Sequence, residues 1–190
     1  MKLIHVRPAT ITDVRAILEI YNDAVLNTTA NYDYEPRTLE QRINWFADHE
    51  KSGHPVLVAV APGGAVVGWS ALNRYHDRPG YRFTTENSVY VAADHRGKGV
   101  GKLLMTPLVA AARERGFHAI IAAIDAANTA SVRLHASFGF EQVGLFKQVG
   151  FKFGRWLDVA YMELLLPQSL SDSIREGKLP ESSGSAPGKC

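Results

Sequence analysis

The chain has 190 residues, of which 21 are Lys or Arg and 19 are Asp or Glu, so its formal net charge is +2 at pH 7. That length suits one domain with a sizeable core, and the balanced charge argues against nucleic acid or a membrane surface as a partner. Its one cysteine, Cys190, excludes an intramolecular disulfide, and we therefore expect a protein of the reducing cytoplasm.

Apolar periodicity predicts secondary-structure elements in the order β-α-α-β-β-β-α-β-α-β-β. Alternating or continuously apolar runs predict seven strands, at residues 2–7, 55–61, 65–75, 84–92, 118–125, 141–146 and 156–166. Helical spacing predicts four helices, which run from Thr12 to Val25, over 38–53, from a glycine turn to about Gly116, and over 128–140.

This order of elements favours an α/β fold with a mixed sheet, hairpins on one side, a βαβ crossover in the middle and helices on both faces. Residues 1–166 are expected to form a single domain. From Pro167 the composition changes to Ser, Gly, Pro and scattered charge, so 167–190 is expected to be a poorly ordered tail.

A glycine-rich turn stands between the strand at 84–92 and the helix that follows it. Its residues are Arg96, Gly97, Lys98, Gly99, Val100, Gly101 and Lys102. Glycines let the main chain approach an anion closely, and the first turn of a helix offers unpaired N–H groups. The spacing is neither a P-loop nor a complete dinucleotide fingerprint. A phosphate site and a tight strand–helix junction therefore both remain open on this motif alone.

Five segments together resemble a known family: "IYNDAV" (20–25), "TTENSVYV" (84–91), "HRGKGVG" (95–101), "NTASVRLHASFGF" (128–140) and "VGFKFGRWLDV" (149–159). In combination they look like the GCN5-related N-acetyltransferases (GNAT superfamily), in the branch of the phosphinothricin and methionine sulfone/methionine sulfoximine acetyltransferases. The resemblance spans roughly residues 3–166. It implies the GNAT fold, with a mixed sheet of about seven strands and a splayed central strand pair.

The resemblance also implies an activity, which is direct acetyl transfer from acetyl-CoA, the co-substrate, to the amino group of a small amino-acid-like substrate. Two alternatives remain: acetylation of protein or peptide amines, and a non-catalytic CoA-binding module. The relatives also imply a homodimer paired through the apolar, glycine-containing segment 149–156 and the strand at 159–166.

The resemblance assigns the acetyl-CoA contacts to three places. The main chain of Val89, Tyr90 and Val91 would pair with the pantetheine arm like an added strand. The amides of 97–102 would hold the pyrophosphate. The side chain of Asn128 would contact the cofactor, and as the first residue of a helix it can also serve as a cap.

Three groups are candidates for the chemistry. Glu86 matches the glutamate proposed as general base in this branch, and its alternative is an ion pair with Arg82. His135 would either transfer a proton or line the CoA sulfur without doing so. The N–H of Val91 would donate to the thioester oxygen if its strand carries a bulge. The seven histidines have no metal-ligand spacing, so we expect no metal.

An amino-acid substrate needs a cation for its carboxylate, ideally a bidentate arginine, and the loop at 74–82 supplies several. The expected substrate contacts are Tyr32, His76, Asp77, Arg78, Arg82, Glu86, Asn87 and Ser88. Relatives of the methionine sulfone group tend to carry Trp-Arg where this chain has Tyr75-His76, so the choice of substrate stays open. Lys152 and Arg155 are interpreted either as cations behind the pocket or as part of a solvated turn.

Overall fold

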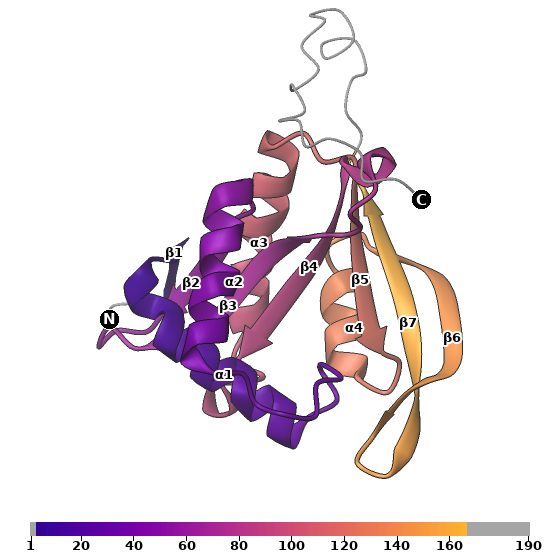
Figure 1. Ribbon diagram of the computed structural model, residues 1–190, viewed down its shortest axis with the longest axis horizontal. Coiled ribbons are helices and arrows are strands. Elements are labelled where there is room, and N and C mark those ends of the chain that lie inside the picture. Colours follow the sequence, from indigo (N-terminus) through magenta and orange to yellow (C-terminus); the bar gives the residue numbers. More distant parts are fainter. Residues whose placement is uncertain (1–2, 167–190) are drawn as a thin grey trace, which may run out of the picture.

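A computed structural model describes residues 3–166 as one seven-stranded sheet with helices on both faces (Figure 1). The strands are β1 (His5–Pro8), β2 (Val56–Val60), β3 (Val66–Arg74), β4 (Thr84–Val91), β5 (Ala119–Asp125), β6 (Glu141–Lys152) and β7 (Arg155–Leu165). The helices are α1 (Val14–Asn27), α2 (Leu39–Ser52), α3 (Val100–Glu114) and α4 (Thr129–Ala136). The predicted order of elements is confirmed, while the expected tail and Cys190 lie outside the described residues.

The strands follow the order β1-β2-β3-β4-β5-β7-β6, and every neighbouring pair is antiparallel except β4 and β5. That parallel pair is joined only where 84–86 face 119–121. Beyond Glu86 the two strands diverge, which confirms the predicted splayed pair (Figure 1). A parallel pair needs a crossover connection, and α3 supplies it.

The two faces of the sheet bury different clusters. Helices α1 and α2 cover the face that carries Trp69, with Ile17 and Phe46 buried against it. Helix α3 covers the other face, where Leu104 and Met105 are completely buried, and α4 packs on the same side through Leu134. Side chains of β4 alternate between these faces. Val89 therefore packs on the side of α3, and Tyr90 packs on the side of α1 and α2.

The β6–β7 hairpin is longer than predicted, because β6 continues to Lys152 rather than ending at residue 146. The pairing slips between Phe146 and Gly150, and Gln148 has a positive φ of 54° there. Such an irregularity breaks the period-2 pattern from which strands are predicted. The hairpin then turns at Phe153 and Gly154, with φ values of 52° and 71°.

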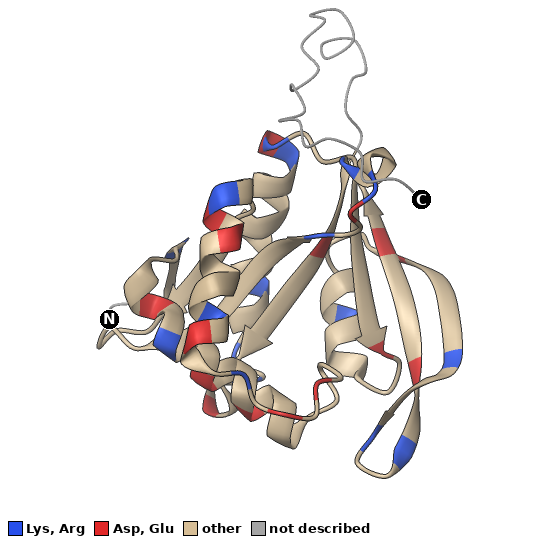
Figure 2. Cartoon of the chain, viewed as in Figure 1, with Lys and Arg blue, Asp and Glu red and all other residues tan. Residues whose placement is uncertain are grey.

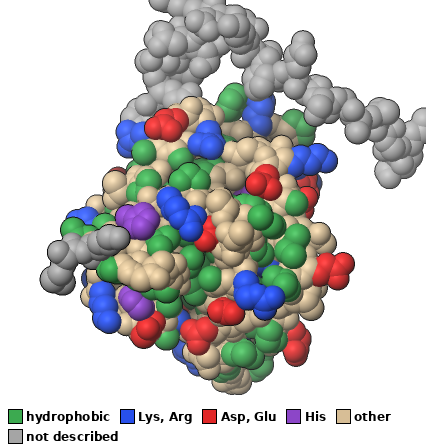
Figure 3. Space-filling view, turned by 90° about the vertical axis from the view of Figure 1, so that its left-hand side faces the viewer, with side chains coloured by type: hydrophobic (Ala, Val, Ile, Leu, Met, Phe, Trp, Pro, Cys, Tyr) green, Lys and Arg blue, Asp and Glu red, His purple; other side chains and the backbone are tan. Residues whose placement is uncertain are grey.

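Charged residues are distributed over all layers of the domain (Figure 2). On the face seen in Figure 3, acidic, basic and apolar side chains are intermixed. None of the helices within residues 3–166 has the length and apolar character needed to cross a bilayer.

Candidate active site

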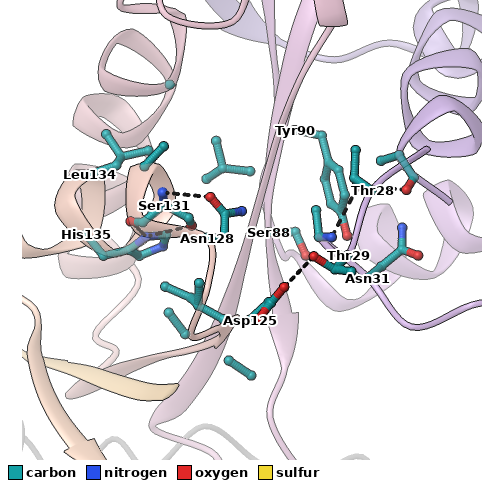
Figure 4. Close-up of a pocket in the computed structure, with 18 of the residues that line it drawn as sticks. Thr28, Thr29, Asn31, Ser88, Tyr90, Asp125, Asn128, Ser131, Leu134 and His135 are labelled. Carbon is teal, nitrogen blue, oxygen red and sulfur yellow. Dashed lines mark hydrogen bonds between the residues drawn. The ribbon is translucent and has the colours of Figure 1, made fainter. Parts of the chain in front are cut away.

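A cleft of about 1200 Å³ opens where β4 and β5 separate. Figure 4 shows its two walls: Ser88 and Tyr90 with the chain at Thr28–Asn31 on one side, and α4 with Asn128 and His135 on the other. The glycine turn forms one end of the cleft, and the β6–β7 hairpin borders another part of it through Val149 and Arg155. The segments predicted to bind the cofactor and to supply the general base therefore line the same cleft.

The glycines of the turn have two distinct roles. Gly97 and Gly99 have φ values of 73° and 82°, and a Cβ at either position would meet none of the described atoms within 4 Å. A Cβ at Gly101 would instead lie 3.0 Å from Leu134 of α4. Gly101 therefore lets the start of α3 pack closely against Leu134 of α4. Gly97 and Gly99 instead leave open space, which suits the close approach of an anion.

The main-chain donors of the turn point to the same use. The bond from Leu103 N to Gly99 O, at 3.2 Å, links the first turn of α3 to its N-cap. The N–H groups of 100–102 therefore precede the ladder of α3 and have no intrahelical acceptor. Lys102 lines the cleft, whereas Lys98 is exposed and lies outside its lining.

Arg96 braces the turn as well as lining the cleft. Its Nε donates to Val91 O at 3.0 Å, and its Nη2 forms an ion pair with Asp23 of α1 at 2.9 Å. These bonds hold the turn against the end of β4 and against α1. The positive charge of Arg96 is thus partly neutralised before any phosphate binds.

The open edge of β4 faces the cleft. Ala92 N donates to Val67 O at 3.0 Å, and in an antiparallel ladder the residues that face the partner strand alternate. The main-chain groups of Val89 and Val91 therefore point away from β3, into the gap toward β5. Those of Tyr90 point to β3, opposite Trp69, while its side chain lines the cleft.

The bulge on which the proposed role of the Val91 N–H was conditional is absent from the β3–β4 pairing that the structure describes. The register runs without a shift from Arg74↔Thr85 to Gly68↔Val91, whereas a bulge would place two residues opposite one. That condition is therefore not met. It is also unnecessary, because alternation alone turns the Val91 N–H toward the gap.

Glu86 lines the cleft at the point where β4 and β5 part. Within residues 3–166 its carboxylate has no hydrogen bond or ion pair, so the alternative pairing with Arg82 is not formed. Arg82 lies over the Phe83 ring at 4.4 Å and donates to Pro79 O. Burial raises the pKa of Glu86 above its ordinary value, and the nearby His76 partly opposes that shift.

His135 is buried in α4, with only 4% of its surface exposed. Its Nδ1 lies 2.8 Å from Ser131 O, which can only accept, so Nδ1 carries the hydrogen. In the neutral ring Nε2 then accepts from Asn87 Nδ2 at 2.9 Å. Burial lowers the pKa of His135, which favours this neutral form.

Asn128 caps α4, as its position in the sequence predicts. Its Oδ1 accepts from Ser131 N at 3.1 Å. The residue also lines the cleft, with its amide nitrogen directed into it (Figure 4). One side chain can therefore serve as helix cap and as a polar contact within the cleft.

The segment 28–36 and the β6–β7 hairpin are joined beside Tyr32, which lines the cleft. A Cβ on Gly150 would lie 2.5 Å from the Tyr32 ring, so only glycine leaves room for it. Lys152, 3% exposed, donates to Asn31 O at 2.9 Å. The interpretation of Lys152 as part of a solvated turn was wrong, because the lysine is buried beneath this loop.

The loop between β3 and β4 takes no part in lining the cleft. Of the predicted substrate contacts, His76, Asp77, Arg78 and Arg82 lie outside its lining, whereas Tyr32, Glu86, Asn87 and Ser88 belong to it. Asp77 forms an exposed ion pair with Arg74 at 3.2 Å. The loop does act electrostatically on the cleft, because His76 acts to lower the pKa of Glu86 against the larger effect of burial.

Asp125 and Thr29 were not predicted from the sequence. Asp125, 6% exposed at the end of β5, accepts from Thr29 Oγ1 and thereby joins the two walls of the cleft (Figure 4). An aspartate that directly follows a buried apolar strand is the signal that could have identified it. Among residues 3–166 no group of His, Cys, Asp or Glu side chains is arranged to hold a metal ion.

Comparison with known proteins identifies close relatives. The model of the acetyltransferase (GNAT) family matches residues 15–140. The L-methionine sulfoximine/L-methionine sulfone acetyltransferase of Pseudomonas aeruginosa is 45% identical over 166 residues, which cover 87% of this chain and 96% of the relative.

Solved structures show the same architecture. The GNAT superfamily phosphinothricin acetyltransferase of Sinorhizobium meliloti, in complex with acetyl-CoA, superposes with a TM-score of 0.86 at 38% identity, covering 90% of this chain and 93% of that one. The ribosomal-protein-alanine N-acetyltransferase of Brucella melitensis has a TM-score of 0.82 at 46% identity, covering 85% and 99%. The predicted fold class is confirmed by this agreement.

Proposed function

The chain belongs to the acetyltransferase (GNAT) family, and from that premise we propose that it transfers the acetyl group of acetyl-CoA to the amine of a small amino-acid-like substrate. The acceptor would be of the methionine sulfoximine, methionine sulfone or phosphinothricin type, as the names of its relatives indicate. The observation that carries the proposal is the free edge of β4 beside the open glycine turn.

The residues present fit acetyl-CoA along the whole cleft. The main-chain N–H and C=O of Val89 and the C=O of Val91 can pair with an extended amide-bearing chain such as pantetheine, which leaves the Val91 N–H for the acyl oxygen. The amides of 97–102, with Lys102 beside them, suit a pyrophosphate, and Asn128 adds a side-chain contact. Acetyl-CoA would supply an activated acetyl thioester at the point where β4 and β5 separate.

Glu86 is proposed to take the proton of the acceptor amine, directly or through water. An α-amino group titrates at about 7.7–8.0 in peptides and is mostly protonated at pH 7, so attack requires a base. The raised pKa of Glu86 moves it toward that of the amine, which makes the proton transfer less unfavourable. The Val91 N–H would stabilise the negative charge that develops on the acyl oxygen.

For His135, the geometry supports lining the cleft without transferring a proton. Its Nδ1–H is engaged by Ser131 O, and its Nε2 lone pair is engaged by Asn87. In this arrangement the ring has no free proton for a leaving thiolate. Its position instead orients Asn87, the residue that follows the proposed base.

A homodimer is proposed on the basis of the β6–β7 hairpin. Between residues 143 and 156 of the hairpin, seven large apolar side chains are 42–61% exposed, namely Val143, Leu145, Phe146, Val149, Phe151, Phe153 and Trp156. An edge strand with such a surface favours pairing with a second copy. A cytoplasmic location remains part of the proposal and is supported by the single cysteine.

The test is a CoA-release assay with confirmation of the product by mass. Methionine sulfoximine, methionine sulfone, phosphinothricin and the twenty amino acids would be compared with a peptide that begins with alanine, because one similar structure carries the name of a protein-alanine enzyme. Turnover of the amino-acid group alone supports the proposal. Preference for the peptide would favour the protein acetyltransferase, and binding of acetyl-CoA without any acceptor turning over would favour a CoA-binding module.

A further inference from the structure

A network of polar side chains runs from α2 across β3 to the strand of the proposed base. Asn73 of β3 lies opposite Glu86 in the ladder. Its Nδ2 donates to Glu86 O at 3.1 Å and to Ser88 Oγ at 3.0 Å. Glu86 and Ser88 both line the cleft, so Asn73, which does not, is connected to the cleft through these two residues.

His49 of α2 holds the other end of the Asn73 amide. Its ring is 8% exposed, with Nδ1 2.8 Å from Trp45 O and Nε2 3.1 Å from Asn73 Oδ1. Both of these oxygens can only accept, so the two contacts are satisfied together when each ring nitrogen carries a hydrogen. The Trp45 ring packs against His49 with 4.3 Å between the ring centroids, which restricts the imidazole to this position.

The Asn73 amide has one orientation that satisfies its neighbours. Glu86 O can only accept, so the amide nitrogen faces it and the amide oxygen faces His49. Turning the amide over would place two oxygens against each other at Glu86 and two donors against each other at His49. The contact with His49 therefore keeps the Asn73 nitrogen in the position from which it donates to Ser88.

This orientation determines where the Ser88 hydroxyl points. Because Ser88 Oγ accepts from Asn73, its own hydrogen turns away from that residue. Within residues 3–166 this hydrogen has no acceptor, and Ser88 lies in the wall of the cleft (Figure 4). The hydroxyl is therefore left as a donor for a group that binds in the cleft.

The hydroxyl lies beside the proposed base. Glu86 and Ser88 are two residues apart on β4, so their side chains share one face of the strand and start about 6.5 Å apart. No direct hydrogen bond joins the two side chains in the part of the chain that the structure describes. Since one hydrogen bond spans about 3 Å, the space between carboxylate and hydroxyl suits one small polar group such as an amine.

The network adds little to the pairing of the strands themselves. β3 and β4 pair without a register shift over their common length, and alternation along β4 directs the main-chain groups of Glu86 toward β3. The ladder therefore already fixes the main chain of the proposed base. The direction of the Ser88 hydroxyl, in contrast, depends on the side chain of Asn73.

We propose that His49 and Asn73 are positioning residues for acetyl transfer, which act by directing the Ser88 hydroxyl into the space beside Glu86. The inference rests on the proposed function and adds to it a donor next to the base. Without Asn73 the hydroxyl is free to rotate, so a smaller fraction of the bound complexes has the productive arrangement. The expected loss is therefore in kcat.

The first test measures acetylation of L-methionine sulfoximine by Asn73→Leu, which keeps the size of the side chain and removes its hydrogen bonds. We expect kcat to fall at least tenfold and the affinity for acetyl-CoA to stay within twofold. Thr85→Val is the matched control, because Thr85 Oγ1 donates to Asn73 O at 2.7 Å from the opposite face of the same strand pair. A smaller loss in Asn73→Leu, or an equal loss in Thr85→Val, would overturn the proposal.

A double-mutant cycle establishes whether Asn73 acts through Ser88. Once Ser88→Ala has removed the hydroxyl, the further change Asn73→Leu should lower kcat by less than threefold, because no hydroxyl remains to be directed. A larger additional loss would count against the proposal, since Asn73 would then act on the fold or on another group.

His49 supplies a second pair of variants, which keeps the proposal testable if melting curves show that Asn73→Leu fails to fold. His49→Phe keeps an aromatic ring and removes both donors, so kcat should fall at least threefold. His49→Gln, whose amide can still donate to Asn73 Oδ1, should retain at least half of the wild-type kcat. The same loss in both variants would assign the role of His49 to packing and refute its positioning of Asn73.

A measurement without substrate separates this inference from the proposed function. In proton–nitrogen NMR spectra of the wild type, the side-chain amide hydrogens of Asn73 should exchange with water at least tenfold more slowly than those of the exposed Asn27. His49→Phe should reduce this protection. If the wild type acetylates no amino acid, the proposed function fails, yet the exchange rates still test the network. Unprotected Asn73 hydrogens in the wild type would refute the network by themselves.

Discussion

Replacing Glu86 with Gln should reduce turnover without weakening the fold. The substitution preserves the shape of the side chain and removes its capacity to accept a proton. General-base catalysis is typically worth about 10²–10⁴-fold, or ~3–5 kcal/mol of activation free energy. We therefore expect kcat to fall by that factor in single-turnover experiments, with the affinity for acetyl-CoA nearly unchanged.

Removing the charge of Glu86 should not lower the free energy of unfolding, whereas removing a charge that belongs to an ion pair would lower it. Burial raises the folded-state pKa of Glu86 above the ordinary value that the side chain has in the unfolded chain. Ionisation therefore costs folding free energy as the pH rises from the unfolded-state pKa through the folded one, and the cost is fully present above the folded-state pKa. Gln removes the charge, so the melting temperature at pH 7 should stay the same or increase.

The pH profile provides a third measurement. Because a base must be ionised, the wild-type rate should fall as the pH drops through the raised pKa of Glu86, and this limb should flatten in Glu86→Gln. Glu114→Gln, which removes an exposed carboxylate at the end of α3, serves as the control. Near-native turnover in Glu86→Gln would refute the reasoning and assign the base to water or another group.

Three further predictions concern other parts of the molecule. Gly99→Val should weaken acetyl-CoA binding at least tenfold, about 1.4 kcal/mol, in a calorimetric titration, whereas Gly64→Val, at a turn glycine with a similar φ of 88°, should not. Asp13→Asn should lower the unfolding free energy at pH 7 by up to ~2 kcal/mol, because Arg7 lowers the pKa of Asp13 to about 2. In urea melts, the difference in unfolding free energy between wild type and variant should vanish as the pH falls from about 4 toward 2. Light scattering should give twice the chain mass of 20.9 kDa, and Trp156→Glu on the exposed hairpin should shift it toward the monomer; a monomeric wild type would contradict the dimer.

The order of elements could be predicted because helices and strands leave periodic signals in the sequence. The cap at Asn128 and the glycine turn follow from local chemistry, and both lie where the sequence indicates. The end of β6 could not be predicted, since the positive φ at Gln148 and the slip before Gly150 interrupt the alternation. Roles such as that of Glu86 came from the family resemblance, because a strand glutamate alone does not reveal its partners.

The positively charged side chains were the hardest part to predict. Lys152 belongs to a segment that reads as a turn, yet it is buried against the main chain of Asn31. Arg42 lies on a helix whose spacing indicates nothing unusual, yet Tyr21 and Trp45 enclose it. Long cationic side chains have both an apolar stem and a charged end, so their burial depends on tertiary neighbours that periodicity does not encode.

The same limitation applies to the arginines that were expected to bind the substrate. Arg78 was expected to contact the substrate because it resembles the arginine of the phosphinothricin enzymes, but its side chain is exposed and lies outside the lining of the cleft. An exposed guanidinium gains little from an added carboxylate, since screening and side-chain entropy offset the attraction.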